Sequence, residues 1–478
     1  MPAPAETAHR GPAARLLHRL FAPVDAVSLA FFRIGFGLLM VLHTGSYLVD
    51  GKAYNLFHTT NLRFKYFGFA WVEPLPPAAL EGVFWLLVLA AIGIALGLFY
   101  RLAATVFFVA YTYVFLLDAA YYNNHQYLIC LLGLLMAVVP AHRELSLDAR
   151  RLHAERHAPA WALWLLRFQI GLPYFFGGLA KINADWLLRG QPMALWLGEG
   201  DLAKVALLQQ PWMPWLLSWG GFLLDLLAVP LLLWRRTRLA TFLVLVAFHV
   251  TNSQLFNIGV FPWLMIWATL LFFPPDWPRR LRPAAAAAGR SQEGPIALPA
   301  RAPGVAALLA LWVALQLLLP YRYLLYPGPV DWTDEAHLFS WRMKLRDKRG
   351  EVRFVAIDPR SRKLIPLPGV APRLLSDRQR RHMDHDPELM RQFAGHLAQQ
   401  LAEKGYPGLE IHVITNLSFN GRPPQPIVDP KVDLASQPAR LGPAPWIVPL
   451  ASDGGPAVVS PAPAAPAGAI PAAAPTTP

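Results

Sequence analysis

Residues 82–100 read GVFWLLVLAAIGIALGLFY, a run of 19 residues without a charged side chain. A helix rises about 1.5 Å per residue, so this run is long enough to cross a ~30 Å hydrocarbon layer. Similar runs recur through the first 326 residues, and only 15% of the whole chain is charged. A soluble domain carries about 25% charged residues. The sequence therefore predicts an integral membrane protein.

We expect eight or nine membrane-spanning helices and favour nine. The expected spans cover residues 28–48, 82–100, 102–117, 126–140, 161–181, 212–234, 239–256, 257–275 and 303–326. Several are short, and Pro173, Pro230 and Pro262 interrupt others, which keeps eight spans as the alternative. The fold class is thus a polytopic α-helical membrane domain over residues 1–326, containing a low-complexity linker at 278–303.

A smaller α+β, strand-rich soluble domain is expected over residues 327–450. Its expected strands cover residues 337–346, 350–358 and 409–416. An amphipathic helix should begin at Asp386-Pro387, because apolar residues recur at every fourth position from Leu389 to Leu401. Residues 451–478 are almost entirely Pro, Ala and Gly, a composition that cannot bury enough apolar surface to fold, so this tail is expected to be disordered.

Positive charge alternates between successive loops and indicates the orientation. With the N-terminus in the cytoplasm, the inside loops carry Arg101, the arginines at 143–156, those at 235–238 and those of the 279–301 linker. The opposite loops carry only Lys52, Arg63, Lys65, Arg189 and Lys204. The positive-inside rule favours this arrangement, and an odd span count then places the soluble domain outside. A bacterial inner membrane, with the first span retained as an anchor rather than cleaved, is the expected location.

Composition also excludes several classes of function. The net charge of +13 is spread over short interhelical segments rather than one amphipathic face, which disfavours nucleic-acid binding. Cys130 is the single cysteine and lies within an apolar run, so an intramolecular disulfide, a cysteine metal cluster and thiol-pair redox chemistry are excluded. No metal site is expected.

Polar side chains inside the expected spans are the candidate functional residues. An Arg, Lys or Asp at the centre of a span costs at least ~2.5 kcal/mol, so each one needs a reason. These residues are Arg33, Asp118, Asn123, Asn124, His125, Arg167, Lys181, Asp185, Asp225, His249 and Asn252. Three groups among them, 123–125, 181–185 and 249–252, share the outer end of their spans. A site facing the soluble domain is expected there.

Each candidate also has a purely structural interpretation. Arg33, Asp118, Arg167 and Asp225 are interpreted as interhelical ion pairs or hydrogen-bonding struts rather than catalytic groups. His249 could be a satisfied interhelical histidine. Lys181, at the end of a span, could simply extend its amine to the interface.

The segment from Tyr174 to Trp186, YFFGGLAKINADW, resembles the active-site segment of vitamin K-dependent gamma-glutamyl carboxylases. The resemblance is to bacterial-type members with an HTTM-type membrane domain, and it runs in order from about residue 25 to 450. Its further blocks are residues 28–40, Tyr100-Arg101, 113–125, 249–262, Trp332-Thr333, 339–341 and 418–433.

The resemblance implies a reaction in which O2 oxidises reduced vitamin K to its epoxide and thereby generates a strong base. That base removes a gamma-proton from a glutamate, and the carbanion adds CO2. Lys181 then corresponds to the lysine that deprotonates the hydroquinone, and His125 to a histidine of quinone binding and proton transfer. Burial disfavours a charged lysine and makes a general base of it. The remaining residues expected to bind substrate or cofactor are Asn123, Asn124, Asp185, Trp186, His249 and Asn252.

The implied partners are the lipid bilayer, the quinone and a glutamate-containing peptide or protein. The chain departs from the vertebrate enzymes, since Tyr323 stands where the family often has a histidine and one cysteine cannot form their disulfide. Vertebrate-type propeptide recognition is therefore not expected. The alternative function is a non-catalytic scaffold, transporter or peptide-binding protein. A scaffold would not need the polar set of Lys181, His125, Asn124 and Asp185, so the enzyme is favoured.

The arginine asymmetry predicts the outcome of a topology experiment. A reporter fused after Pro329 should behave as extracytoplasmic, and one inserted in the 279–301 linker as cytoplasmic. Alkaline phosphatase and green fluorescent protein activities measure the two sides. If both reporters indicate the same side, the span count is wrong by one.

Overall fold

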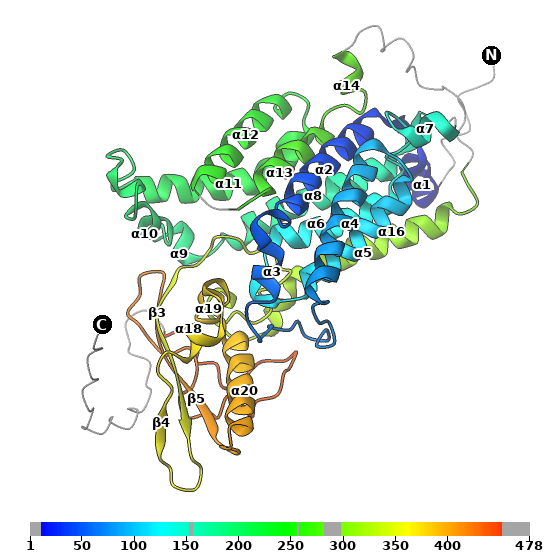
Figure 1. Cartoon of the computed structure of the whole chain (residues 1–478). Helices are drawn as coiled ribbons and strands as arrows, with labels where there is room; N and C mark the ends of the chain where they lie inside the picture. The colour runs from blue at the N-terminus through cyan, green and yellow to red at the C-terminus, as the bar shows by residue number, and fades with distance from the viewer. Residues whose placement is uncertain (1–10, 153–155, 256–257, 282–297, 452–478) are drawn as a thin grey trace, which may run out of the picture.

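The computed structural model describes residues 11–152, 156–255, 258–281 and 298–451. A helical domain occupies most of the chain, and a smaller domain built on a three-stranded sheet lies at one end of it (Figure 1). Helices α7 (Leu147–Leu152) and α14 (Trp277–Arg280), both rich in arginine, lie at the side of the helical domain away from the sheet (Figure 1). This separation agrees with the expected orientation. Most of the 278–303 linker and the tail beyond residue 451 fall outside the described residues.

The main helices coincide with the nine expected spans. They are α2 (Val27–Gly45), α4 (Pro77–Leu96), α5 (Tyr100–Leu116), α6 (Asn124–Val138), α8 (Ala160–Ala180), α11 (Met213–Leu233), α12 (Arg238–Leu255), α13 (Phe261–Thr269) with η4 (Leu270–Phe272), and α16 (Ala302–Leu318) with η6 (Leu319–Leu325). Shorter elements connect them: α1 (Pro12–Phe21), η1 (Val49–Gly51), α3 (Lys52–Phe57), η2 (Ala119–Tyr121), α9 (Ala184–Leu187), α10 (Met193–Leu197), η3 (Leu202–Lys204) and α17 (Val330–Thr333). Strands β1 (Pro23–Asp25) and β2 (His157–Pro159) form a small antiparallel pair.

Length and composition qualify only some of these helices as membrane spans. Within the described residues, α2, α4, α11 and the continuous α16–η6 segment are long and apolar enough to cross a membrane. Helices α5, α6 and α13–η4 are apolar but shorter. Helices α8 and α12 have the length but carry more polar residues, among them Arg167 and His249. The count of eight or nine spans therefore stays a prediction.

Arg33 of α2 shows how the helical domain accommodates a charge in its interior. Its guanidinium is fully buried and donates hydrogen bonds to the carbonyls of Ile94 and Ala95, at 2.6 and 2.5 Å, at the C-terminal end of α4. It also donates to the carbonyls of Ala141 and Leu145, at 3.1 and 2.6 Å. The last carbonyls of a helix have no intrahelical donor, so Arg33 satisfies groups that would otherwise be buried unpaired. Arg33 thus joins α2, α4 and the chain after α6.

The smaller domain has one antiparallel sheet with strand order β4–β3–β5. Its elements are β3 (Lys348–Ile357), β4 (Leu364–Pro366), α18 (Val370–Leu374), α19 (Asp377–Met383), α20 (Pro387–Glu403) and β5 (Glu410–Phe419). Helix α20 begins as the sequence predicts, because the Asp386 side chain accepts hydrogen bonds from the backbone of Glu388 and Leu389. Phe393 of α20 packs on Phe354 of β3 with ring centroids 4.8 Å apart. The expected α20, β3 and β5 are confirmed.

The strand expected at residues 337–346 is wrong. This segment is irregular, and Phe339, Trp341 and Lys344 all adopt the left-handed region, with φ of 61°, 56° and 52°. A strand needs extended backbone at consecutive residues, which these angles exclude. Its aromatic side chains instead pack against the helical domain, where Phe339 and Trp341 contact Tyr122 and Tyr127.

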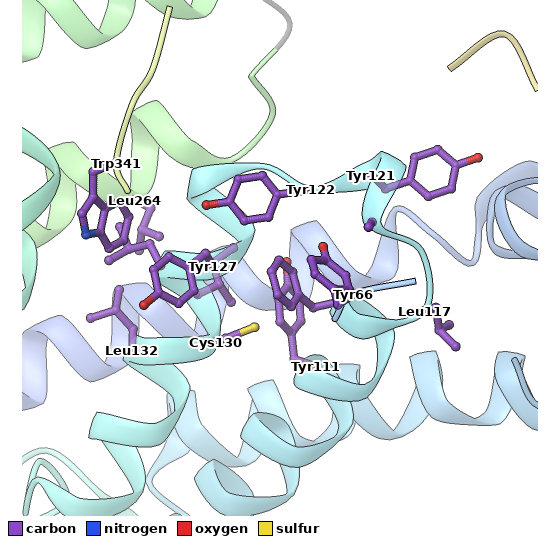
Figure 2. Packing of buried hydrophobic residues seen from close by; sticks show 14 of the residues in the cluster. Tyr66, Tyr111, Leu117, Tyr121, Tyr122, Tyr127, Cys130, Leu132, Leu264 and Trp341 are labelled. Atoms are coloured by element: carbon purple, nitrogen blue, oxygen red, sulfur yellow. The ribbon is translucent and has the colours of Figure 1, made fainter. Parts of the chain in front are cut away.

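Phe339 and Trp341 form an aromatic seam between the two domains. The ring of Phe339 lies 4.9 Å from Tyr127 and 5.4 Å from Tyr122, centroid to centroid. Trp341 is 1% exposed, and its ring lies 5.0 Å from that of Tyr127. Figure 2 shows Trp341 beside Tyr127 and Leu264, with Tyr122 close by. The seam fixes the small domain over the outer ends of α5 and α6.

Phe339→Ala should loosen this seam. Removing a packed aromatic ring leaves a cavity, with an expected loss on the order of 3 kcal/mol. The purified protein should melt at a lower temperature, and the chain between residues 327 and 347 should be cleaved faster by protease. Tyr406→Ala is the matched control, because Tyr406 is 62% exposed. Equal cleavage rates in the two variants would contradict the seam.

Candidate functional site

Lys181 and Asp225 form a buried ion pair between α8 and α11. Lys181 caps the C-terminus of α8, and its Nζ lies 2.6 Å from Oδ2 of Asp225. Nζ also donates to the carbonyl of Gly177 at 3.1 Å, and both charged residues are less than 9% exposed. The helices meet closely at Gly178, where an added Cβ would lie 2.8 Å from the backbone nitrogen of Leu226. Glycine there allows Asp225 to reach the lysine.

The surroundings of this pair are largely apolar. Nζ of Lys181 lies 5.3 Å from the centroid of the Trp186 ring, within cation–π range. Trp186 packs with Ala180 and with Leu345 of the small domain. Met343 approaches Gly177 from the same segment, its Cε 3.7 Å from the position of an added Cβ. A buried ion pair is a weak contributor to stability because desolvation offsets its attraction, so a functional reason is favoured.

Asp185 faces the small domain rather than Lys181. Its carboxylate accepts two hydrogen bonds from the Arg422 guanidinium, at 2.7 and 2.5 Å, and one from Asn420 Nδ2 at 2.9 Å. Arg189 adds a contact at 3.2 Å. Asp185 therefore holds the two domains together beside the candidate base.

A second polar group lies further along α8. The hydroxyl of Tyr174 is 2.7 Å from Nε2 of His249 in α12. Tyr174, Gly177 and Lys181 are spaced so that they share one face of α8. Among the described residues, Nδ1 of the buried His249 has no hydrogen-bond partner. A buried unpaired ring nitrogen is a candidate contact for a polar ligand.

His125, the other predicted catalytic residue, lies near Phe261, which is also close to His249. Its ring is 6.0 Å from the ring of Phe261, and the ring of His249 lies 6.1 Å from the same phenylalanine. The described contacts of Lys181 do not include His125. The structure thus groups Lys181 with Asp225 and Trp186, and His125 with Phe261 and His249.

The two asparagines before His125 belong to the domain seam. Asn124 accepts from the hydroxyl of Tyr122 at 3.0 Å and donates to the carbonyl of Arg342 at 3.2 Å. Asn123 donates to the carbonyl of Tyr121 at 3.1 Å. Both therefore orient backbone at the outer end of α6. Asn252 is partly exposed on α12.

Arg167 makes contacts that resemble those of Arg33. It donates to the carbonyls of Leu271 and Phe273, at 2.7 and 3.0 Å, beyond the end of α13. The guanidinium also lies over the ring of Trp164 at 4.9 Å. These contacts satisfy the end of a helix and place no charge near Lys181.

Two hollows lie near the seam on the opposite side of α6. One is a cavity of about 30 Å³ bordered by Thr44, Tyr111, Tyr121 and Gln126, among others. The other is an open groove of about 750 Å³ beside α3 and α19. Neither is lined by Lys181 or His125, so a single pocket lined by both stays a prediction. Among the described residues, no cluster of His, Cys, Asp and Glu side chains is arranged to hold a metal ion.

The sequence interpretation missed several residues of this region. Asp225 was expected to form an interhelical ion pair or a hydrogen-bonding strut, and the structure has it in an interhelical ion pair, but its partner, Lys181, was not predicted. Tyr174, Asn420 and Arg422 lie in segments that resemble the carboxylase family, but no role was predicted for them. One sequence feature could have identified Asp225. An intramembrane lysine needs a counter-charge, and Asp225 is a carboxylate within another expected apolar span.

Two family models match the chain. The model described as HTTM domain matches residues 21–277, and the model described as vitamin K-dependent gamma-carboxylase, lumenal domain, matches residues 301–453. No solved structure matches the chain. The first match ends at residue 277 and the second begins at residue 301, so the linker separates them and the last apolar helix, α16, lies within the second match.

The burial of Asp118 beside the small domain predicts that the stability of the protein depends on pH. Asp118 lies between α5 and α6, and its carboxylate accepts from the backbone of Phe64 and Ala120 and from Gln379 of the small domain. Burial raises the pKa of Asp118 to about 6 from its ordinary 3.8. The folded state therefore binds a proton more tightly than the unfolded state, so stability falls as pH rises from about 4 to 6.

Asp118→Asn should remove this part of the pH dependence. A pKa shift of about two units corresponds to a change of roughly 3 kcal/mol in the free energy of unfolding. The difference in melting temperature between the wild type and Asp118→Asn should therefore change between about pH 4 and 6. Thermal melting in detergent from pH 4 to 7 measures it. If the melting temperatures of the wild type and Asp118→Asn changed with pH in parallel, Asp118 would be excluded as the titrating group.

Proposed function

The chain belongs to the vitamin K-dependent gamma-glutamyl carboxylase family, and from this we propose that it is a membrane-bound enzyme that couples oxidation of a reduced quinone to carboxylation of glutamate side chains. The observation that carries the proposal is the buried Lys181–Asp225 pair beneath the small domain. Family membership indicates a membrane protein with an extracytoplasmic C-terminal domain. The particular reaction rests on the site.

The residues around Lys181 fit a quinone. A quinone ring needs an apolar enclosure and a few polar contacts for its oxygens. Trp186 supplies an aromatic face, while Lys181 Nζ and the unpaired Nδ1 of His249 supply polar atoms. The reduced quinone, when bound, supplies the electrons and, with oxygen, the strong base that removes the glutamate proton.

Asp225 allows Lys181 to act as a proton acceptor in an apolar site. The pair is neutral overall whether its shared proton lies on Nζ or on Oδ2 of Asp225. With that proton on Asp225, the free amine of Lys181 can accept another from a bound hydroxyl. The pair then carries one positive charge, which stabilises the negative charge left behind at the donor oxygen. Asp225 is thus proposed as part of the base.

His249 and His125 are proposed to complete the quinone side of the site. Tyr174 fixes the ring of His249 through the 2.7 Å contact with Nε2, which leaves Nδ1 to face a ligand. The rings of His125 and His249 both lie about 6 Å from the ring of Phe261, at 6.0 and 6.1 Å. The family resemblance assigns His125 to quinone binding and proton transfer. Asn124 holds the start of α6, and with it His125, against the small domain.

The small domain is proposed to present the glutamate substrate. Its residues 343–345 already contact the surroundings of Lys181 through Met343 and Leu345. A glutamate side chain delivered along this segment would meet the base where it is formed. A non-catalytic scaffold would gain nothing from a buried ion pair at that place.

The proposed reaction can be tested in membranes containing the protein. Incubation with reduced vitamin K, O2, labelled bicarbonate and glutamyl peptides should give both quinone epoxide and peptide-bound label. The two products are measured separately, by chromatography and by scintillation counting. Epoxide without label would restrict the enzyme to epoxidation, and the absence of both would favour the scaffold.

Substitution of Lys181 tests its role as the base. Lys181→Ala should lower epoxidation by about 10²- to 10⁴-fold, the usual contribution of a general base. A small added amine should restore part of the activity by entering the vacated space. Lys181→Arg should not restore it, because a guanidinium stays protonated. The rates are measured by epoxide formation.

Two further variants complete this test. Lys204→Ala is the matched control, because Lys204 pairs with Asp201 at an exposed site and should keep normal activity. Asp225→Asn should also lower the rate, since the amide cannot take up the shared proton. Normal epoxidation by a well-expressed Lys181→Ala protein would show that Lys181 is only an interface lysine.

A further inference from the structure

The turn after β5 reaches from the small domain to the residues that surround Lys181. It comprises Phe419–Arg422 and is called here the clamp turn. Asn420 and Gly421 both adopt the left-handed region, with φ of 50° and 79°. This local reversal lets Asn420 and Arg422 bind the same carboxylate, that of Asp185. The clamp turn is thus built around one residue of the helical domain.

The clamp turn is itself held rigidly in the small domain. Asn420 Oδ1 accepts from the backbone nitrogen of Asp347 at 2.8 Å, and the backbone nitrogen of Asn420 donates to the Asp347 carbonyl at 2.9 Å. The guanidinium of Arg422 lies 5.4 Å from the centroid of the Phe419 ring. A fork of two parallel hydrogen bonds from arginine to a carboxylate is directional. The position of the sheet therefore determines where Arg422 and Asn420 hold the carboxylate of Asp185.

Asp185 and Trp186 lie on α9, which has only four residues, Ala184–Leu187. So short a helix is not stable by itself and takes its position from tertiary contacts. Its polar contacts include the Asn183 cap on the backbone of Trp186, the bond from Trp186 Nε1 to the Ser218 carbonyl at 2.7 Å, the bond from Trp219 Nε1 to the Leu187 carbonyl at 3.1 Å, and the clamp on Asp185. The clamp is the polar contact among these that comes from the small domain, and Leu345 adds an apolar contact of that domain with Trp186.

Trp186 in turn covers the amine of Lys181, as its ring lies 5.3 Å from Nζ. A displaced ring would admit water and weaken every electrostatic interaction within the site. The contacts run without interruption from Arg422 through Asp185 and Trp186 to Lys181. We propose that Arg422 is a positioning residue, which, through Asp185, sets the placement of Trp186 over the base and makes its reactivity depend on docking of the small domain. This inference rests on the proposed function for its kinetic test only.

Chemical labelling tests the clamp without reference to catalysis. Reductive methylation of the full-length protein in detergent, followed by mass spectrometry, measures the rate at which Lys181 is modified. Lys181 should be methylated several-fold faster in Arg422→Ala and in Asp185→Asn than in the wild type. The matched control is Arg349→Ala, which removes another interdomain ion pair, that with Glu199, and the pair of Arg349 with the side chain of Asp347. It leaves Asp185 and the bonds between the Asp347 backbone and Asn420 in place. Its Lys181 should react at the wild-type rate.

Epoxidation kinetics provide the second arm. In Arg422→Ala, kcat should fall by about 100-fold, the loss that a displacement near 1 Å produces, while KM for the quinol changes little. Arg422→Lys keeps the positive charge but cannot form two parallel hydrogen bonds to Asp185. Its kcat should therefore lie between those of the wild type and Arg422→Ala. Arg349→Ala should keep the wild-type kcat.

The two arms separate failure of the clamp from failure of the proposed function. A wild type without epoxidation would refute the function, yet labelling would still decide the clamp. If Arg422→Ala cannot be purified, Arg422→Lys and Asp185→Asn decide it by the same measurement. The proposal would be overturned if Lys181 were methylated in Arg422→Ala, Arg422→Lys and Asp185→Asn at the same rate as in Arg349→Ala.

Discussion

A charged or polar group buried among apolar helices must find a partner, and the architecture of this protein follows from that requirement. Arg33 and Arg167 meet it at helix ends, where backbone carbonyls lack intrahelical donors. Lys181 meets it across two helices, with Asp225. The first solution stabilises the helical domain. The second places a buried ion pair, the proposed base, between α8 and α11.

The same requirement explains how the domains are joined. The irregular segment from Ala336 to Arg346 gives up sheet hydrogen bonds, and its aromatic rings pack on the helical domain instead. Its arginines, Arg342 and Arg346, pair with Asp331 and Asp334 of the small domain. Phe339 donates its backbone N–H to the Tyr122 hydroxyl at 2.7 Å while its ring packs into the seam. On the other side, Arg422 and Asn420 close on Asp185. Contacts of the small domain thus reach residues next to Lys181.

The candidate site could be predicted only in part from sequence. An intramembrane lysine followed by Asp185 and Trp186 indicates chemistry because such residues are costly there. The pairing of Lys181 with Asp225 could not be predicted, since 44 positions separate them and several apolar helices could have supplied the partner. Asp185 was expected to bind a ligand, yet it is occupied by Arg422. The unpaired nitrogen of His249 is equally a property of the packed structure.

Sequence by itself determined the apolar helices, the start of α20 and the strands β3 and β5, because these follow from local periodicity and capping. It failed at residues 337–346, where a strand was expected and the backbone is irregular. Three residues there adopt left-handed backbone, which only the packing of Phe339 and Trp341 against another domain can stabilise. Contacts between segments far apart in the chain leave no local pattern. Tertiary structure alone therefore decided that Lys181, Asp225, Trp186 and Arg422 meet.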